Sequence, residues 1–397
     1  MNVIYPYSRP QVTAEDISAV IDVLQTQFLT QGPNVEEFEN ELAAITGAKF
    51  AIVCNSGTAA LHLAYLAFGL GPEKGLLTSP ITFLATANAA RMCGAPVVFA
   101  DVDPLTGNLT PESVTEALRT STVPIGAIAA VHLGGRPCDL AALREIASAN
   151  DCKLIEDAAH APLASYSDSG GRVYHVGACS HSDVAVLSFH AIKHVAMGEG
   201  GAVLTNDAAV AERARILRSH GMVRDSSRWA SPPEADASWY YEMQELGWNY
   251  RATDLQCALG RSQLNRLRPN LQRRYEIAKH YDHLLADIPH LRRPKQPTLP
   301  DGNSRHLYSV DIDFDSLGCT RGEVMRQLMN LGVGTQVHYI PVYRQPYYAS
   351  ANNGRFTGAE RYYAGTLSIP MYVGLEERDQ KIISQNLRTA LTHCSSS

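Results

Sequence analysis

The chain lacks the features typical of membrane proteins, disulfide-rich proteins and nucleic-acid-binding proteins. Nowhere do about 18 consecutive apolar residues occur, as a spanning helix would need, and the start, MNVIYPYSRP, has no basic segment followed by an apolar one. None of the eight cysteines lies in a CxxC pair, which argues against a zinc site and a disulfide framework. Lysine and arginine form no block, and the formal net charge is only -6. We therefore expect a cytoplasmic protein with reduced cysteines that binds neither membranes nor nucleic acid.

The first part of the chain carries the pattern of an α/β protein. Helices are predicted from Thr13, which caps TAEDISAVIDVLQT, and over VEEFENELAAIT, which Gly47 ends. Six short apolar runs then alternate with helical stretches: FAIVC, VVFAD, IGAIAAV, KLIED, VAVLSF and GAVLT. Because these runs are apolar on both faces, they predict a mainly parallel sheet covered by helices on both sides.

The character of the sequence changes beyond about residue 255. An arginine-rich helical stretch over 255–288 leads into a proline-rich connection, the strand-like HLYSVDIDF and the helical TRGEVMRQLMNLG. The 397 residues, 45% of them hydrophobic, are enough for two cores. We therefore predict a large α/β domain over 1–255, with an N-terminal helical segment, and a smaller α+β domain over 256–397.

Three motifs after apolar runs are candidates for a functional site. Asn-Ser-Gly-Thr at 55–58 joins a strand to a helix, and such a turn suits a phosphate, although a plain turn capped by Ser56 or Thr58 explains the same residues. Asp157 ends KLIED, at the sheet edge where α/β proteins bind ligands, but it could simply cap the next helix. Lys193, in SFHAIKHVAMGEGG, could be a surface charge, a phosphate ligand or an amine kept neutral by burial.

Taken together, the three motifs match the requirements of pyridoxal phosphate. This cofactor needs a lysine for its aldehyde, a carboxylate opposite its pyridine nitrogen and donors for its phosphate. Lys193, Asp157 and the turn Ser56-Gly57-Thr58 supply one each. The sequence therefore predicts a pyridoxal-phosphate enzyme with Lys193 and Asp157 as catalytic residues and with no metal.

Segments along almost the whole chain resemble the fold-type I, pyridoxal-phosphate-dependent nucleotide-sugar aminotransferases. They are FLTQGPNVEEFE, NSGTAALHLA, TFLATANAA, VHLGGRPCD, EDAAHA, SFHAIKHVAMGEGGAV, GWNYRATDLQCALGRSQL and LSIPMY. The resemblance implies a mainly parallel, seven-stranded sheet sandwiched by helices. Within the family, FLTQGP, SHGM, YEMQELGWNYRATDLQCALG and QVHYIPVYRQPYY are most similar to the branch of pseudaminic acid biosynthesis.

That branch implies a particular reaction. An amino group would move from glutamate, which leaves as 2-oxoglutarate, to C4 of a UDP-linked 4-keto-6-deoxy-N-acetylhexosamine. Another keto nucleotide sugar, aminated at C3 or C4 or carrying a different nucleotide, is the alternative. One departure concerns the sugar side, because Tyr343 stands where similar proteins usually carry histidine.

The resemblance also implies roles for individual residues. Lys193 would hold the cofactor covalently and Asp157 would face its ring nitrogen. The other cofactor contacts would be the backbone N–H groups of Gly57 and Thr58, the Ser188 hydroxyl, the Asn249 amide from the neighbouring subunit, Phe83 stacked on the ring, and His160 near the phenolic oxygen. Phe28, Thr30, His338 and Tyr339 are the candidate substrate contacts. If Asn249 crosses over, the active unit is a homodimer with shared sites. Without the resemblance, Phe83 is read as core, His160 as a satisfied buried histidine and Ser188 as a cap.

Two other classes of protein fit less well. Cofactor-dependent sugar dehydratases of similar sequence carry histidine in place of the lysine, and a non-catalytic partner subunit would have lost Lys193, Asp157 or the phosphate turn. His190 and His194 could in principle bind zinc, but a useful site needs a third ligand. Their role is left open.

Overall fold

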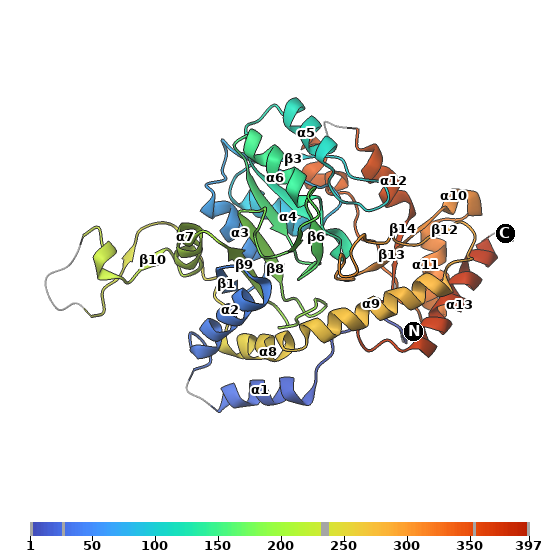
Figure 1. The fold of residues 1–397 in the computed structure, drawn as a ribbon, viewed down its shortest axis with the longest axis horizontal. Helices are drawn as coiled ribbons and strands as arrows, with labels where there is room; N and C mark the ends of the chain where they lie inside the picture. The colour runs from blue at the N-terminus through green and yellow to red at the C-terminus, as the bar shows by residue number, and fades with distance from the viewer. Residues whose placement is uncertain (1–2, 26–27, 232–237, 352–354, 395–397) are drawn as a thin grey trace.

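The computed structural model describes residues 3–25, 28–231, 238–351 and 355–394, and its centre is a seven-stranded sheet (Figure 1). The strand order is β1-β9-β8-β5-β4-β2-β3. The strands are β1 (Phe50–Cys54), β2 (Gly75–Thr78), β3 (Val97–Phe99), β4 (Ile125–Val131), β5 (Lys153–Asp157), β8 (Val184–Ser188) and β9 (Gly201–Thr205). All neighbours pair in parallel except β9, which is antiparallel to both β1 and β8.

All six predicted apolar runs are strands of this sheet, so the mainly parallel arrangement is confirmed. The sequence did not predict β2, because its four residues, GLLT, are too few to show a period. The antiparallel direction of β9 was also not predicted. Direction is set by the connection from β8, which is a short glycine-rich segment here and not a helix.

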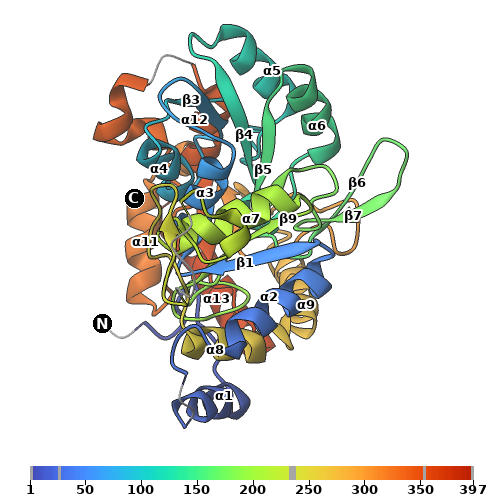
Figure 2. The same cartoon turned by 90° about the vertical axis from the view of Figure 1, so that its left-hand side faces the viewer.

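Helices cover both faces of the sheet. They are α2 (Pro33–Thr46), α5 (Pro111–Thr120) and α6 (Leu140–Ala149) on one face, and α3 (Gly57–Ala67), α4 (Leu84–Met92) and α7 (Ala208–Arg218) on the other. Successive side chains of a strand point to opposite faces. Ile128 and Ala130 accordingly belong to the first core, and Ala127 and Ala129 to the second. Figure 2 shows this layering from the side.

A third core lies in the C-terminal part of the chain. It is built from residues between 277 and 391. Its elements are α9 (Leu267–Leu284), β12 (Leu291–Arg292), β13 (Tyr308–Ile312), α10 (Phe314–Leu317), α11 (Arg321–Asn330), α12 (Thr357–Gly365), β14 (Thr366–Ile369) and α13 (Glu377–Cys394). The predicted helical stretch 255–288 is in fact two helices, α8 (Asp254–Leu264) and α9, and Pro269 lies in the first turn of α9, where it costs no hydrogen bond. The domain boundary after residue 255 stays a prediction, and that position lies in the first turn of α8.

The remaining elements are short or peripheral. They are α1 (Ala14–Leu24), the hairpins β6 (Ser165–Ser167) with β7 (Val173–His175) and β10 (Met222–Val223) with β11 (Glu242–Met243), and the 3-10 turns η1 (Leu133–Gly135), η2 (Ser226–Arg228), η3 (Val342–Arg344) and η4 (Pro346–Ala351). Figure 1 shows the segment around β10 projecting away from the body. Among the described residues, no helix has the length and apolar character needed to cross a membrane. Free thiols are found at Cys54, Cys93, Cys138, Cys152, Cys179, Cys257 and Cys319.

Helix α1 is confirmed, but its apolar side faces solvent. Asp16 is fully buried and accepts hydrogen bonds from Ser262 and Gln263 of α8, at 2.6 and 2.8 Å. This polar contact turns Ile17 and Ile21 outward, so both side chains are exposed. One chain alone therefore leaves an apolar stripe of α1 uncovered.

An ion pair closes the free edge of β1, one of the two edge strands of the sheet. The Glu39 carboxylate accepts a hydrogen bond from the Val53 N–H at 2.9 Å, and the Arg218 guanidinium donates to the Val53 carbonyl at 2.5 Å. Arg218 also donates to Glu39. Since both outward backbone groups of Val53 are satisfied, this part of the edge is closed to pairing with another strand.

The start of α2 depends on a carboxylate from another helix. Asp254 of α8, which is fully buried, accepts hydrogen bonds from the N–H groups of Gly32 and Asn34. Gly32 is the N-cap residue of α2 and has no side chain of its own for this purpose.

Replacing Asp254 by alanine is expected to lower the free energy of unfolding by about 2 kcal/mol, because two partly buried N–H groups lose their charged acceptor. Asp207 offers a matched control, since it accepts from two N–H groups of α7 in a more exposed position. Asp207→Ala is expected to cost about 1 kcal/mol. Urea unfolding followed by fluorescence measures both. A smaller loss for Asp254→Ala than for Asp207→Ala would contradict the assignment.

Candidate active site

A cavity of about 370 Å³ opens at the carboxyl ends of the central strands. Val131 of β4, Asp157 of β5 and Ser188 of β8 reach it from the sheet, and the first turn of α3 forms another wall. Carboxyl ends of parallel strands meet at one edge, which is where open α/β sheets bind ligands. The cavity therefore lies where the fold favours a functional site.

Most of the predicted site residues line this cavity. They are Ser56, Gly57, Thr58, Phe83, Asp157, His160, Ser188, Lys193 and Tyr339. The three motifs, although far apart in sequence, are thus brought together around one space.

Four predicted residues do not line the cavity within a single chain. Phe28, Thr30 and Asn249 are exposed, and Thr30 and Asn249 form isolated bridges with Thr253 and Ser219, respectively. His338 is buried and its Nδ1 lies 2.8 Å from the Ser368 hydroxyl. Burial lowers the pKa of His338 to about 3, so its imidazole is neutral. The contacts with cofactor or substrate that the sequence predicted for these four residues stay predictions.

The turn after β1 forms an anion-binding corner. Ser56 is the N-cap of α3, and its hydroxyl accepts from the Ala59 N–H at 3.1 Å. The N–H groups of Gly57 and Thr58 belong to the first turn, whose donors have no partner within the helix. A Cβ at Gly57 would lie 2.9 Å from the Ser188 Cβ and 3.1 Å from its Oγ. Only glycine therefore lets this helix end approach the Ser188 hydroxyl so closely that both can face the same ligand.

The two carboxylates at the end of β5 point in opposite directions, as the strand period requires. Glu156 is fully buried, accepts from the Ser182 hydroxyl at 2.5 Å and lies 3.3 Å from His132 Nε2. Asp157 faces the cavity and accepts from the Thr86 hydroxyl at 2.7 Å and the Ala159 N–H at 3.3 Å. Asp157 is therefore the carboxylate available to a ligand.

Lys193 lies in the turn that follows β8 and projects into the same cavity as Asp157. Burial lowers the pKa of Lys193 to about 8, and the negative charge of Asp157 opposes this shift. Among the described residues, no side chain forms an ion pair or hydrogen bond with its amine. A substantial fraction of this amine is therefore neutral near pH 8 and free to react.

His160 and Tyr339 form a hydrogen-bonded pair in the cavity wall. His160 Nδ1 accepts from the Gly134 N–H at 3.3 Å, and its Nε2 lies 3.2 Å from the Tyr339 hydroxyl. Burial, together with the charge of Lys193, places the pKa of His160 well below its usual value, so the ring is neutral. Because Nδ1 accepts, Nε2 carries the ring proton and donates a hydrogen bond to the Tyr339 hydroxyl.

His190 and His194 have separate environments. His190 lies at the cavity, with its Nε2 3.9 Å from Glu199 Oε1, whereas His194 is buried and its Nε2 is 2.8 Å from the Ser304 carbonyl. In the described part of the chain, no group of three or more His, Cys, Asp or Glu side chains is arranged to hold a metal ion.

The sequence analysis did not single out Thr82, Thr86 or Glu199, which also line the cavity. Thr82 and Thr86 are four residues apart in TFLATA, a spacing that could have indicated one helix face. Tyr343 does not line the cavity. It is buried and donates to Glu360 at 2.8 Å.

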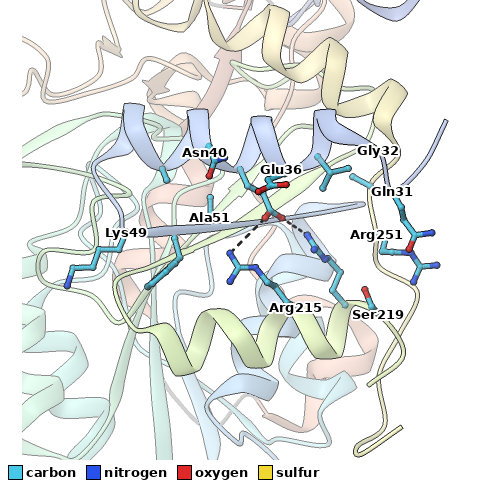
Figure 3. Close-up of a pocket in the computed structure, with 15 residues that line it drawn as sticks. Gln31, Gly32, Glu36, Asn40, Lys49, Ala51, Arg215, Ser219 and Arg251 are labelled. Carbon is cyan, nitrogen blue, oxygen red and sulfur yellow. Dashed lines mark hydrogen bonds and ion pairs between the residues drawn. The ribbon is translucent and has the colours of Figure 1, made fainter. Parts of the chain in front are cut away.

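A second cavity, of about 490 Å³, lies beside β1 between α2 and α7 (Figure 3). Its cations do not converge on a common point. Lys49 and Arg251 lie at opposite ends in this view, while Arg215 turns toward Glu39 at 3.9 Å. This space does not have the geometry of an anion site, and it contains none of the chemistry around Lys193.

The sheet, with its one antiparallel strand, and the lysine- and aspartate-lined cavity define a fold-type I transferase, as the sequence predicted. The chain belongs to the DegT/DnrJ/EryC1/StrS aminotransferase family, whose description matches residues 10–388. It is thus an enzyme of the aminotransferase class, and the family implies pyridoxal phosphate as cofactor.

Similar proteins span almost the whole chain. The spore coat polysaccharide biosynthesis protein SpsC of Bacillus subtilis is 38% identical over 389 residues, covering 96% of each chain. A UDP-4-amino-4,6-dideoxy-N-acetyl-beta-L-altrosamine transaminase of Campylobacter jejuni is 36% identical over 386 residues, covering 97% of each. The solved structure of Helicobacter pylori PseC, an aminotransferase of pseudaminic acid biosynthesis, superposes with a TM-score of 0.88 at 30% identity, covering 98% of this chain and 99% of that one.

The lowered pKa of Lys193 predicts an unusual pH dependence for its reactivity. An amine attacks electrophiles only when neutral, so acetylation of Lys193 in cofactor-free protein is expected to reach half its maximal rate near pH 8. A solvated lysine would do so near about pH 10.4. Because the charge of Asp157 raises this pKa, Asp157→Asn is expected to move the midpoint to lower pH. Competitive labelling read by peptide mass spectrometry measures both midpoints, and a wild-type midpoint near that of a solvated lysine would refute the prediction.

Proposed function

We propose that this aminotransferase binds pyridoxal 5′-phosphate in the cavity around Lys193. The observation that carries the proposal is that Lys193, Asp157 and the anion-binding corner of α3 face one space of about 370 Å³. The N–H groups of Gly57 and Thr58 and the neighbouring Ser188 hydroxyl suit a phosphate, which accepts from backbone N–H and hydroxyl donors. The exposed ring of Phe83 at the cavity is free to stack on a flat ligand.

When bound, pyridoxal phosphate supplies an electron sink that allows a proton to leave the carbon bearing the amino group. Lys193 Nζ takes this proton from the α-carbon of the donor, which its partly neutral state allows. The Asp157 carboxylate keeps the positive charge at the ring nitrogen, in a site sheltered from water. Gly57, Thr58 and Ser188 would hold the phosphate and orient the cofactor toward Lys193.

The proposed reaction moves an amino group from glutamate to C4 of a UDP-linked 4-keto-6-deoxy-N-acetylhexosamine, with release of 2-oxoglutarate. The names of the Campylobacter and Helicobacter relatives support a substrate of the pseudaminic acid type. The alternative is another keto nucleotide sugar, aminated at C3 or C4 or with a different nucleotide. His338, Tyr339, Phe28 and Thr30 stay the proposed substrate contacts.

The active unit is proposed to be a homodimer in which Asn249 reaches the phosphate site of the partner. Within one chain Asn249 is exposed and outside the cavity lining. Large apolar side chains lie uncovered on the same chain, including Ile17 of α1, Trp239, which is 75% exposed, and Leu246, which is 68% exposed. Such surfaces are typical of protein interfaces.

The function is tested by incubating the protein with glutamate and the UDP-linked 4-keto sugar and identifying the amino sugar by NMR. We expect C4 amination and one equivalent of 2-oxoglutarate. Lys193→Ala is expected to lower turnover by a factor of about 10³ or more, because it removes the base. Exposed Lys74 provides the control, and Lys74→Ala should be unaffected. Full turnover by Lys193→Ala would exclude the proposed mechanism, and amination of only a C3-keto or dTDP-linked sugar would favour the alternative substrate.

Complementation between two inactive variants tests the shared site. Lys193→Ala and Asn249→Ala are unfolded and refolded as a 1:1 mixture. If Asn249 acts on the partner's cofactor, each mixed dimer has one intact site, and about a quarter of wild-type activity returns. If Asn249 acts within its own chain, both sites of the mixed dimer are defective and no activity returns.

A further inference from the structure

Asp157 is hydrogen-bonded to a chain of hydroxyl groups that the proposed reaction has not used. The Thr86 hydroxyl is 2.7 Å from Asp157 Oδ2, and the Thr82 hydroxyl is 2.8 Å from that of Thr86. Thr86 is 1% exposed and Thr82 is 2% exposed. The three side chains therefore form a nearly dry hydrogen-bonded series that ends at the carboxylate.

The direction of the protons in this series is determined by its end. A carboxylate only accepts, so the single hydroxyl proton of Thr86 goes to Asp157. The Thr86 oxygen can then only accept from Thr82, which must donate. Both protons thus point toward Asp157, and each bond strengthens the next because they are polarised in the same sense.

The position of Thr86 is held by its helix and by a neighbouring ring. It lies in the first turn of α4, and its carbonyl accepts from the buried Tyr65 hydroxyl at 3.1 Å. A β-branched side chain in a helix has few rotamers. The donor that meets Asp157 Oδ2 is therefore fixed in place before any ligand arrives.

We propose that Thr86 is a positioning residue that fixes the Asp157 carboxylate in the orientation in which it would face the ring nitrogen of the cofactor. A carboxylate held close to a ring nitrogen favours the protonated, positively charged form of that nitrogen. With Asp157 held in this way, the ring nitrogen of the bound cofactor would keep its proton. This inference deepens the proposed function and rests on it.

Other titratable groups also face Asp157. Lys193 lies across the cavity, Tyr65 comes from α3, and Tyr339 comes from the segment after α11. Burial, together with the charge of Asp157, raises the pKa of both tyrosines, so they stay neutral. Of these groups only Lys193 changes charge near neutral pH. The Thr86 variants are therefore compared with wild type at a single pH, and Lys193 is not substituted in any of them.

The test compares Thr86→Val, which keeps the shape but loses the hydroxyl, with Thr86→Ser, which keeps the hydroxyl. Thr78→Val is the matched control, because it removes another fully buried threonine hydroxyl, one that donates to the Ala129 carbonyl and has no contact with Asp157. Each protein is loaded with ¹⁵N-labelled pyridoxal phosphate at pH 8, and the ¹⁵N chemical shift of the ring nitrogen reports its protonation. Cofactor affinity and thermal unfolding are measured on the same samples.

We expect a protonated ring nitrogen in wild type, Thr86→Ser and Thr78→Val, and a ¹⁵N shift toward the unprotonated value in Thr86→Val. An unchanged ¹⁵N shift in folded Thr86→Val would overturn the inference while leaving the proposed function intact. Equal ¹⁵N shifts in Thr86→Val and Thr78→Val would also overturn it, because the loss of any buried hydroxyl would then change the protonation of the ring nitrogen. If wild type binds no cofactor, the proposed function fails, and the inference fails with it.

Discussion

The pairing of one antiparallel strand with two others is the constraint on which the active site depends. Gly201, the first residue of β9, lies opposite both Cys54 at the end of β1 and Ser188 at the end of β8. This register brings the turn that starts α3 beside the segment that carries Lys193. The approach is so close that a Cβ on Gly201 would lie 2.4 Å from the Ser56 carbonyl oxygen. Without glycine at this position the anion-binding corner of α3 could not lie so close to the segment that carries Lys193.

The site is also defined by which groups stay uncharged. Burial places the pKa values of His160, His194 and His306 well below the usual range, and the nearby Lys193 charge contributes. Because these three histidines near Lys193 are neutral, they add no positive charge that would lower the pKa of its amine further. Asp157 acts in the opposite direction and raises it. The chemistry of Lys193 is therefore set by a balance between desolvation and one carboxylate.

Much of the fold could be predicted because it depends on local pattern. Apolar runs predicted six of the seven strands, and caps such as Thr13 and Gly47 predicted where the first helices begin and end. The features that were not predicted either were too short to show a pattern or depend on residues far apart in the sequence. Strand β2 is too short to be periodic, and the reversal of β9 depends on its neighbours. The exposed apolar side of α1 was unexpected because buried Asp16 binds α8 in place of Ile17 and Ile21.

The sequence by itself determined the class of chemistry, since a lysine, an aspartate and a phosphate turn after successive strands are the groups that one cofactor needs, and their spacing resembles a known family. Only the tertiary structure decided which residues share the cavity. It separates Asp157 from Glu156 onto opposite faces of the sheet, brings Thr86 of α4 onto Asp157, and leaves His338, Phe28, Thr30 and Asn249 outside the lining of a single chain. The physical reason is that residue type sets what a side chain can do, whereas strand register and helix packing set what it touches.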